Sequence, residues 1–259
     1  MAAYPYNKSL DDRLRLQELR SVIERMMEQQ VLKDALVLPA LSQLQLLLGA
    51  LATSRAGLAD EVRSRLLAAM MMIYHGLCLH ETIEEGAVPV LERRQLTILG
   101  GDYLSSLFYK VLAEVGHVSA VSLFAKAIAA INEAKMSRHL ARQSNLHTDV
   151  EYLRHGETIH GALLHTLCEI FLPEERVVLF IDLAVAAAVW DEEMAIASRL
   201  GQQTRFGVPE RVQGGFHDAL SRLREASSEL FGADAWTQIQ LLFTYAETSV
   251  ASTKAVEGG

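Results

Sequence analysis

The sequence predicts an all-α protein, and three observations support this. Apolar residues recur at three- and four-residue spacing along almost the whole chain, which is typical of helices with one buried side. Strand-like alternation of apolar and polar residues is scarce. Prolines, which lack a backbone N–H and do least damage between helices, stand between the helical patterns at Pro39, Pro89, Pro173 and Pro209. We therefore expect a single-domain helical bundle over residues 1–259, with about nine helices.

The first helix is expected at about Leu10–Asp34, because apolar residues mark one side of it. These residues are Leu14, Leu19, Val22, Ile23 and Met26. The second is the leucine-rich stretch Leu41–Leu51. The third follows Gly57 and ends near Ile83, and its run Met70–Met72 is expected to fill the core.

The fourth helix opens at Pro89 and ends near Gly116. Later helices are expected at about Val118–Asn145, Asp149–Leu172, Glu174–Gln203, Pro209–Phe231 and Ala235–Val250. The longest apolar run is Val177–Trp190, which Asp182 interrupts. It is too short to cross a bilayer, so it indicates a buried core helix, and we expect no transmembrane segment.

Composition narrows the classes of function. The chain has 259 residues, of which 50% are hydrophobic, and a chain of this length can bury a core without disulfides or metals. Its formal net charge is −8. No Lys/Arg stripe is present, so we expect neither nucleic-acid binding nor a polybasic membrane anchor. Cys78 and Cys168 are the two cysteines, and no signal-peptide pattern opens the sequence. We therefore expect a cytoplasmic protein in a reducing compartment.

A first candidate site is the segment His80-Glu81-Thr82-Ile83-Glu84. His80 and Glu84 are four residues apart and share a helical face. A zinc protease needs a histidine where Glu84 stands. A strong magnesium site needs oxygen ligands, and His80 is the wrong residue for that. The segment is therefore interpreted as a solvated acidic helix end.

Two Glu-x-x-His pairs, Glu114/His117 and Glu157/His160, resemble the ligand pattern of di-iron helical bundles. Gly116, between Glu114 and His117, indicates a helix end, which is a poor place for a buried ligand. His155, His160 and His165 are five residues apart, and five residues turn a helix by about 140°, so they do not converge on one ion. Phosphate-binding glycine loops, nucleophile elbows and Schiff-base lysines are also missing from the sequence. No catalytic constellation is complete.

One stretch, RQLTILGGDYLSSLFY from Arg94 to Tyr109, resembles component 1, the smaller subunit, of bacterial two-subunit heptaprenyl diphosphate synthases. The resemblance is most specific over residues 93–136 and fainter over about 68–172. The family motif is carried by Arg94, Gln95, Gly101, Asp102 and Tyr103. This family is a diverged relative of the all-α trans-prenyltransferases, so the resemblance implies a bundle of the isoprenoid synthase type.

The resemblance also implies that the catalytic machinery is degraded. Catalytic relatives hold a diphosphate through Mg²⁺ on two aspartate-rich motifs and a basic Gly-Lys-x-x-Arg-Pro segment. Here the first motif leaves only the remnant His80, Glu81 and Glu84, and the second only Asp191-Glu192-Glu193, followed by Met194. Leu41–Leu51 carries no basic residue, and Glu157-Thr158 stands where catalysts have Lys-Thr. We therefore assign no catalytic residue and no metal ligand to this chain.

The role implied by the resemblance is a non-catalytic regulatory subunit of a heterodimeric long-chain polyprenyl diphosphate synthase. Its partner is a larger catalytic subunit, which holds the Mg²⁺ and extends farnesyl diphosphate with isopentenyl diphosphate for the menaquinone side chain. This chain itself is expected to bind no cofactor. By the same analogy, Leu104, Leu107, Phe108 and Val111 line the partner interface or the tunnel for the polyprenyl chain; the alternative is ordinary core packing.

Two other functions stay open at this point. One is a stand-alone Mg²⁺-dependent prenyltransferase or terpene-synthase-like enzyme. It would bind metal through Glu81, Glu84, Glu85, Asp191 and Glu192. The other, from a different class, is a helical interaction or metal-storage protein.

Overall fold

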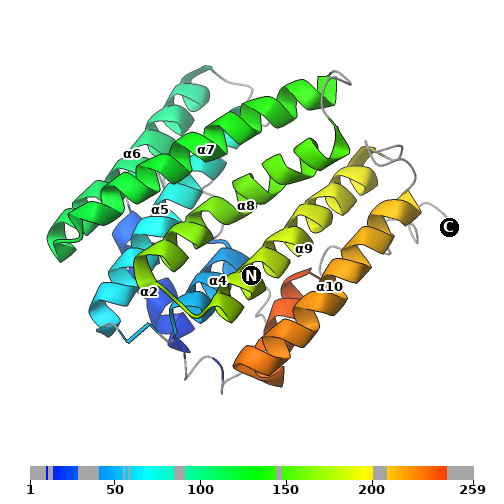
Figure 1. The fold of residues 1–259 in the computed structure, drawn as a ribbon. Helices are drawn as coiled ribbons and strands as arrows, with labels where there is room; N and C mark the ends of the chain where they lie inside the picture. Colours follow the sequence, from blue (N-terminus) through cyan, green and yellow to red (C-terminus); the bar gives the residue numbers. More distant parts are fainter. Residues whose placement is uncertain are drawn as a thin grey trace, which may run out of the picture. The chain divides into compact units, whose positions relative to one another are not determined.

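The computed structural model describes residues 10, 14–28, 41–54, 56–57, 59–84, 91–143, 148–200 and 209–243. Within these ranges the secondary structure is helical, with no strand, which confirms the all-α prediction (Figure 1). The helices with defined bounds are α2 (Leu16–Met27), α4 (Gln43–Thr53), α5 (Asp60–Glu84), α6 (Leu91–Val115), α7 (Val118–Gln143), α8 (Asp149–Phe171), α9 (Glu175–Leu200) and α10 (Pro209–Phe231). Residues 233–243 are also helical.

The chain falls into two compact units, and two of the divisions between them lie within α7 and α8. Unit 1 comprises Met1–Leu10, Ala129–His165 and Pro173–Gly259, and unit 2 comprises Asp11–Ile128 and Thr166–Leu172. The expectation of a single domain over residues 1–259 stays a prediction.

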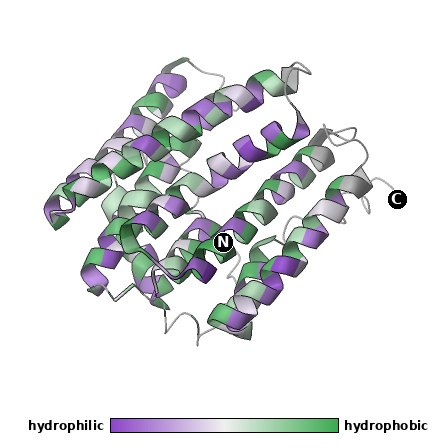
Figure 2. Ribbon diagram, in the orientation of Figure 1, coloured by the Kyte–Doolittle hydropathy of each residue, from purple (hydrophilic) through white to green (hydrophobic). Residues whose placement is uncertain are grey.

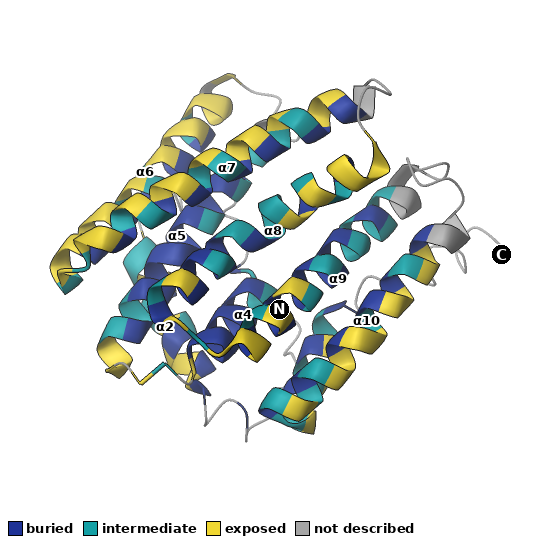
Figure 3. Cartoon of the chain, in the orientation of Figure 1, coloured by how far each residue is buried: buried dark blue, intermediate teal, exposed yellow. Residues whose placement is uncertain are grey.

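The main pair of helices in unit 2 is α5 with α6 (Figure 1). Gly76 of α5 lies against α6 so closely that a Cβ on it would come within 2.9 Å of the carbonyl oxygen of Gly101. Small residues therefore let the two backbones approach. Met70–Met72 are fully buried in the same helix, which confirms their expected place in the core. Figure 3 shows α5 largely buried and α6 with a long exposed side.

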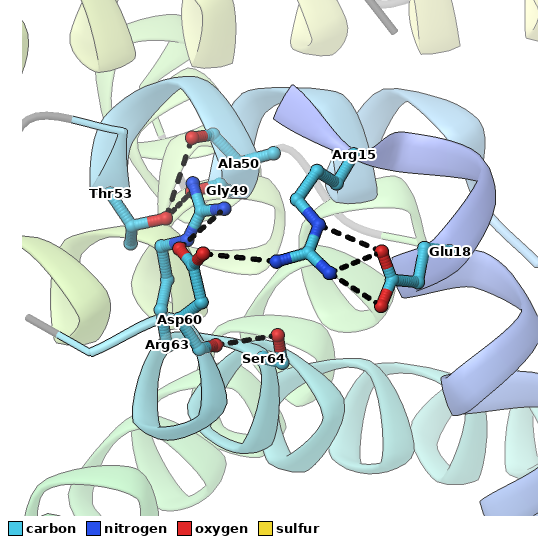
Figure 4. A network of polar contacts seen from close by, with 8 residues as sticks. All are labelled: Arg15, Glu18, Gly49, Ala50, Thr53, Asp60, Arg63 and Ser64. Atoms are coloured by element: carbon cyan, nitrogen blue, oxygen red, sulfur yellow. Dashed lines mark hydrogen bonds and ion pairs between the residues drawn. The ribbon is translucent and has the colours of Figure 1, made fainter. Parts of the chain in front are cut away.

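The first helix is shorter than the predicted Leu10–Asp34. Arg15 has a left-handed backbone with φ of 55°, and α2 begins after it. The guanidinium of Arg15 bonds both Glu18, in the first turn of α2, and, from Nη1 at 2.9 Å, Asp60 at the start of α5 (Figure 4). Arg63 lies on the other side of Asp60, with Nη2 3.5 Å from Oδ1. Residues 11–13 and 29–34 of the predicted helix lie outside the described residues.

In unit 1, α9 and α10 pack side by side. The Phe180 and Phe231 rings meet edge to face, with centroids 5.0 Å apart. The alternating stripes of α10 in Figure 2 reflect a buried side that includes Val212, Phe216 and Leu223. The apolar run Val177–Trp190 lies in α9, as predicted. Across the described residues, none of the helices is long and apolar enough to span a membrane.

Glycine ends α6 where the sequence indicated it would. Gly116 has φ of +74°, a conformation that costs glycine little. The N–H of Gly116 donates to the carbonyl of Ala113, and the N–H of His117 donates to that of Leu112. This is a Schellman cap, which satisfies the last carbonyls of a helix. His117 is therefore outside α6.

Candidate functional site

A buried polar cluster in unit 1 joins three helices. Arg138 of α7 donates from Nη1 to Glu192 at 2.5 Å and from Nη2 to Glu193 at 2.7 Å, both on α9. From α8, the Tyr152 hydroxyl donates to the same Glu193 oxygen at 2.9 Å, and the Nε2 of His160 lies 3.3 Å from Glu192 Oε2. The Arg138 and Glu193 side chains are only 4% and 2% exposed. The cluster is thus a bridged ion pair inside the protein.

The position of Arg138 follows from the pattern of α7. Ile131, Ala134, Arg138 and Ala141 are all buried, and their spacing of three and four residues marks one helical side. Arg138 therefore stands in a core position, where a charge requires a partner. Sequence reasoning missed this residue. The signal in the sequence was a charged residue within the apolar spacing of α7.

The electrostatics of the cluster keep the Glu192 carboxylate ionised. Burial by itself raises the pKa of the Glu192 carboxyl, but His160 and Arg138 outweigh it and hold the pKa at about 2. Burial likewise lowers the pKa of Arg138, but Glu192 and the other cluster members leave it above its usual value. The guanidinium carbon also lies 4.5 Å from the centre of the Tyr152 ring, a favourable cation–π geometry.

These contacts determine whether the remnant of the second aspartate-rich motif could hold a Mg²⁺ ion. Glu192 and Glu193 belong to that remnant, and both are occupied by an arginine and further bonded to an imidazole or a phenol. A Mg²⁺ ion needs free oxygen ligands and room for its waters. The residues present therefore do not fit a magnesium ion.

The remnant of the first motif is engaged with α6 in unit 2. The His80 ring lies against Gly101, and its Nε2 is 3.4 Å from Asp102 Oδ1. Glu81 is partly buried in the same helix turn. The side chain of Glu84 and the whole of Glu85 lie outside the described residues. An imidazole in this position is a poor ligand for a hard cation.

The other predicted patterns are distributed over separate ion pairs. Glu114 accepts a hydrogen bond from Arg65 at 2.8 Å, while His117 lies beyond the end of α6. His165 Nε2 is 3.4 Å from Asp182. Among the residues that the structure describes, no group of three or more His, Cys, Asp or Glu side chains is arranged to hold a metal ion.

Glu157 and Thr158 lie on an open groove between α8 and α9. The groove has a volume of about 380 Å³, and its other lining residues include Arg154, His165, Asp182 and Val185. Its charged groups are of both signs. A site for an anionic diphosphate needs a surplus of positive charge, which this groove does not have.

The family motif residues and the predicted interface residues share α6. Leu104, Phe108 and Val111 are buried in unit 2, and Leu107 is half-buried. Gly101 is buried and Tyr103 half-buried, whereas the three polar residues Arg94, Gln95 and Asp102 are exposed. The roles of the four apolar residues at a partner interface or in a tunnel stay predictions.

Comparison with solved structures identifies the class of this fold. The chain is similar to a heptaprenyl diphosphate synthase from Staphylococcus aureus, with a TM-score of 0.64 and 12% identity over 92% of this chain and 98% of that one. It is also similar to a decaprenyl diphosphate synthase from Rhodobacter capsulatus (TM-score 0.61, 15% identity, 95% and 97% coverage). A geranyltransferase from Legionella pneumophila gives a TM-score of 0.63 at 13% identity, with 93% and 97% coverage. The fold is therefore that of the all-α polyprenyl synthases.

Sequence comparison identifies the family within that class. A family model described as heptaprenyl diphosphate synthase (HEPPP synthase) subunit 1 matches residues 30–199, and the chain belongs to this family. The chain is also 35% identical over 81 residues to heptaprenyl diphosphate synthase component 1 of Geobacillus stearothermophilus. That match spans 31% of this chain and about a third, 36%, of the relative's length.

Proposed function

We propose that this chain is the non-catalytic, regulatory subunit of a heterodimeric long-chain all-trans polyprenyl diphosphate synthase of the heptaprenyl type. Membership of the subunit 1 family supports the assignment to such a synthase. The observation that carries the non-catalytic role is the bridging of Glu192 and Glu193 by Arg138.

The chemistry of chain elongation explains why that bridge matters. An allylic diphosphate leaves as an anion, and metal ions with basic side chains must offset the charge that develops. Here two of the three acids of the remnant on α9, Glu192 and Glu193, are already paired with Arg138. Freeing them means breaking a buried ion pair, which typically costs about 3–5 kcal/mol. The protein's own fold therefore opposes metal binding at this position.

The proposal extends to the partner. The larger subunit carries two intact aspartate-rich motifs, holds the Mg²⁺, and joins isopentenyl units to farnesyl diphosphate. The present chain binds no cofactor and supports elongation, by contacting the partner or the growing polyprenyl chain. The product supplies the menaquinone side chain. The complex works in the cytoplasm, where Cys78 and Cys168 stay free thiols, as they are in this structure.

The test is to assay this chain and the larger subunit separately and mixed, with farnesyl diphosphate, isopentenyl diphosphate and Mg²⁺. We expect long-chain product from the mixture and essentially none from this chain alone. Long-chain product from this chain by itself would overturn the proposal.

Substitution separates a supporting from a catalytic role. In the mixed complex, Glu81→Gln and Asp191→Asn in this chain should leave the elongation rate within about twofold, because neither residue is assigned to catalysis. A loss near 10²-fold or more, the size expected when a transition-state charge stabiliser is removed, would point instead to a catalyst that uses its own acids.

A further inference from the structure

One side of α6 in unit 2 is exposed and carries four large apolar side chains (Figure 3). Leu91, Ile98, Leu99 and Tyr109 are between 44% and 69% exposed. Leu91, Ile98 and Tyr109 are spaced by seven and eleven residues, about two and three helical turns, so they line up along the helix. We infer that this side of α6, from Leu91 to Ala113, is the surface on which the larger subunit docks. We call it the α6 stripe.

The other side of α6 is already occupied. Leu104, Phe108 and Val111 are buried, and the Phe108 ring meets the ring of Phe124 on α7, with centroids 6.3 Å apart. These side chains belong to the core of unit 2. A second molecule that packs along α6 therefore contacts the α6 stripe, which faces away from that core.

The size of the α6 stripe fits the centre of a protein–protein interface. Because α6 has 25 residues, its exposed side is about 37 Å long and about 10 Å wide, or roughly 400 Å². A standard interface takes about 800 Å² from each partner and has an apolar centre within a polar rim. The stripe supplies an apolar centre of suitable size, and the exposed Arg94 and Lys110 flank it as rim residues.

The charges on the α6 stripe disfavour a second copy of this chain as the occupant. Asp102 lies at the middle of the stripe, and Arg94 and Lys110 lie eight residues before and after it. In a two-fold pair of antiparallel α6 helices that overlaps the whole stripe, each Asp102 would face its own copy, and each Arg94 would face a Lys110. Such like-charge contacts are unfavourable. Each copy also has a net charge of −8, which opposes self-association.

A partner with a different sequence avoids these contacts. The chemistry that fits is an apolar helical face with a basic group opposite Asp102 and acidic groups opposite Arg94 and Lys110. Identifying this partner as the larger subunit rests on the proposed function, which gives the present chain such a companion.

The experiment measures binding of the full chain to the purified larger subunit by titration calorimetry. Ile98→Ala and Leu99→Ala should each weaken binding by about tenfold, as expected for apolar side chains at the centre of an interface. The Tm of the chain alone should change little, because both side chains are largely exposed. Leu179→Ala, at an exposed leucine of α9 in unit 1, is the matched control and should bind as wild type does.

A charge substitution tests the polarity of the partner surface. Lys110→Glu should weaken binding at low salt, and its difference from wild type should shrink as the salt concentration rises. Lys110→Arg should keep the wild-type affinity. If an alanine variant lowers the Tm, Lys110→Glu decides the question by itself, because Lys110 is highly exposed.

The outcomes separate this inference from the proposed function. Wild-type affinity in folded Ile98→Ala, Leu99→Ala and Lys110→Glu variants overturns the inference and leaves the proposed function standing. Failure of the wild-type chain to bind the larger subunit overturns both. A homodimer of the wild-type chain that Ile98→Ala dissociates, as measured by sedimentation velocity, also overturns the inference, because the occupant is then a second copy.

Discussion

The imidazole ring of His80 lies over Gly101, so close that a Cβ on residue 101 would come within 2.6 Å of the ring's Cε1. The Nε2 of the same ring is 3.4 Å from Asp102. The histidine of the first-motif remnant on α5 therefore lies against both the glycine and the aspartate of the family motif on α6. These contacts explain the glycine and the aspartate of the motif by packing between two helices, without a substrate.

Gly101→Ala should destabilise the chain, because the added methyl group collides with the His80 ring. Overpacking of this kind typically costs about 1–3 kcal/mol, to be measured by urea unfolding. Combining it with His80→Ala should recover most of the loss. Gly214→Ala is the matched control: nothing lies within 4 Å of its added Cβ, and alanine within a helix should stabilise by about 0.5–1 kcal/mol. Equal losses at both glycines would contradict the assigned contact.

Acid should weaken unit 2 through His75, which is buried and accepts a hydrogen bond from the Ser42 N–H at 3.3 Å. Burial lowers the pKa of His75 to about 4, against about 6.5 in the unfolded chain. Above pH 6.5 both states are neutral. Between 6.5 and 4 the unfolded chain binds the extra proton, so stability falls as the pH falls.

The predicted loss due to His75 between pH 7 and pH 5 is about 2 kcal/mol. His75→Gln should reduce the pH dependence of the unfolding free energy by that amount over this interval. His165→Gln, at a partly exposed histidine, provides the comparison. An unchanged slope in the His75 variant would show that this residue does not carry the effect.

Glu193→Gln should cost about 3 kcal/mol of unfolding free energy. The change leaves the buried Arg138 with one carboxylate in place of two, and breaking buried pairs lies near the upper end of single-site effects. The control is Glu229→Gln, whose ion pair with Arg176 is exposed and should matter by less than about 1 kcal/mol. Similar values for the two variants, from chemical denaturation, would mean that the cluster is not tightly formed.

Leu104 and Leu107 on α6 provide a test of the predicted interface. Leu104→Ala removes a fully buried side chain and should lower the stability of the chain alone by about 2–5 kcal/mol. Leu107 is half-buried, so Leu107→Ala should change that stability less. If the residue contacts the partner, the variant should bind the larger subunit more weakly, which titration calorimetry measures. Wild-type affinity in a stable Leu107 variant would argue for simple core packing.

The helices were predictable because their apolar spacing is local information. The bounds of α10 match the prediction, and α8 and α9 differ from it by a few residues at most. The break at Arg15 was not predictable, since no glycine, proline or capping residue marks it. The Arg15 side chain bonds a partner 45 positions away, Asp60, and contacts between distant segments do not show in local periodicity.

The candidate site was predictable only in part, for a similar reason. The acids of α9 were visible as a run, and the histidines as isolated residues. One arginine on α7 pairs with two of those acids, and this pairing depends on the tertiary structure. The spacing around Arg138 held a hint, because the residue lies in the apolar repeat of Ile131 and Ala134, but its partner was identifiable only in three dimensions.

The bridge from Arg138 also sets the register of α7 along α9 within unit 1. A slip of one turn, about 5.4 Å, would separate the guanidinium from both acids and leave ions stranded in an apolar interior at several kcal/mol each. The ion pair thus favours the one axial setting of α7 in which the guanidinium meets both acids.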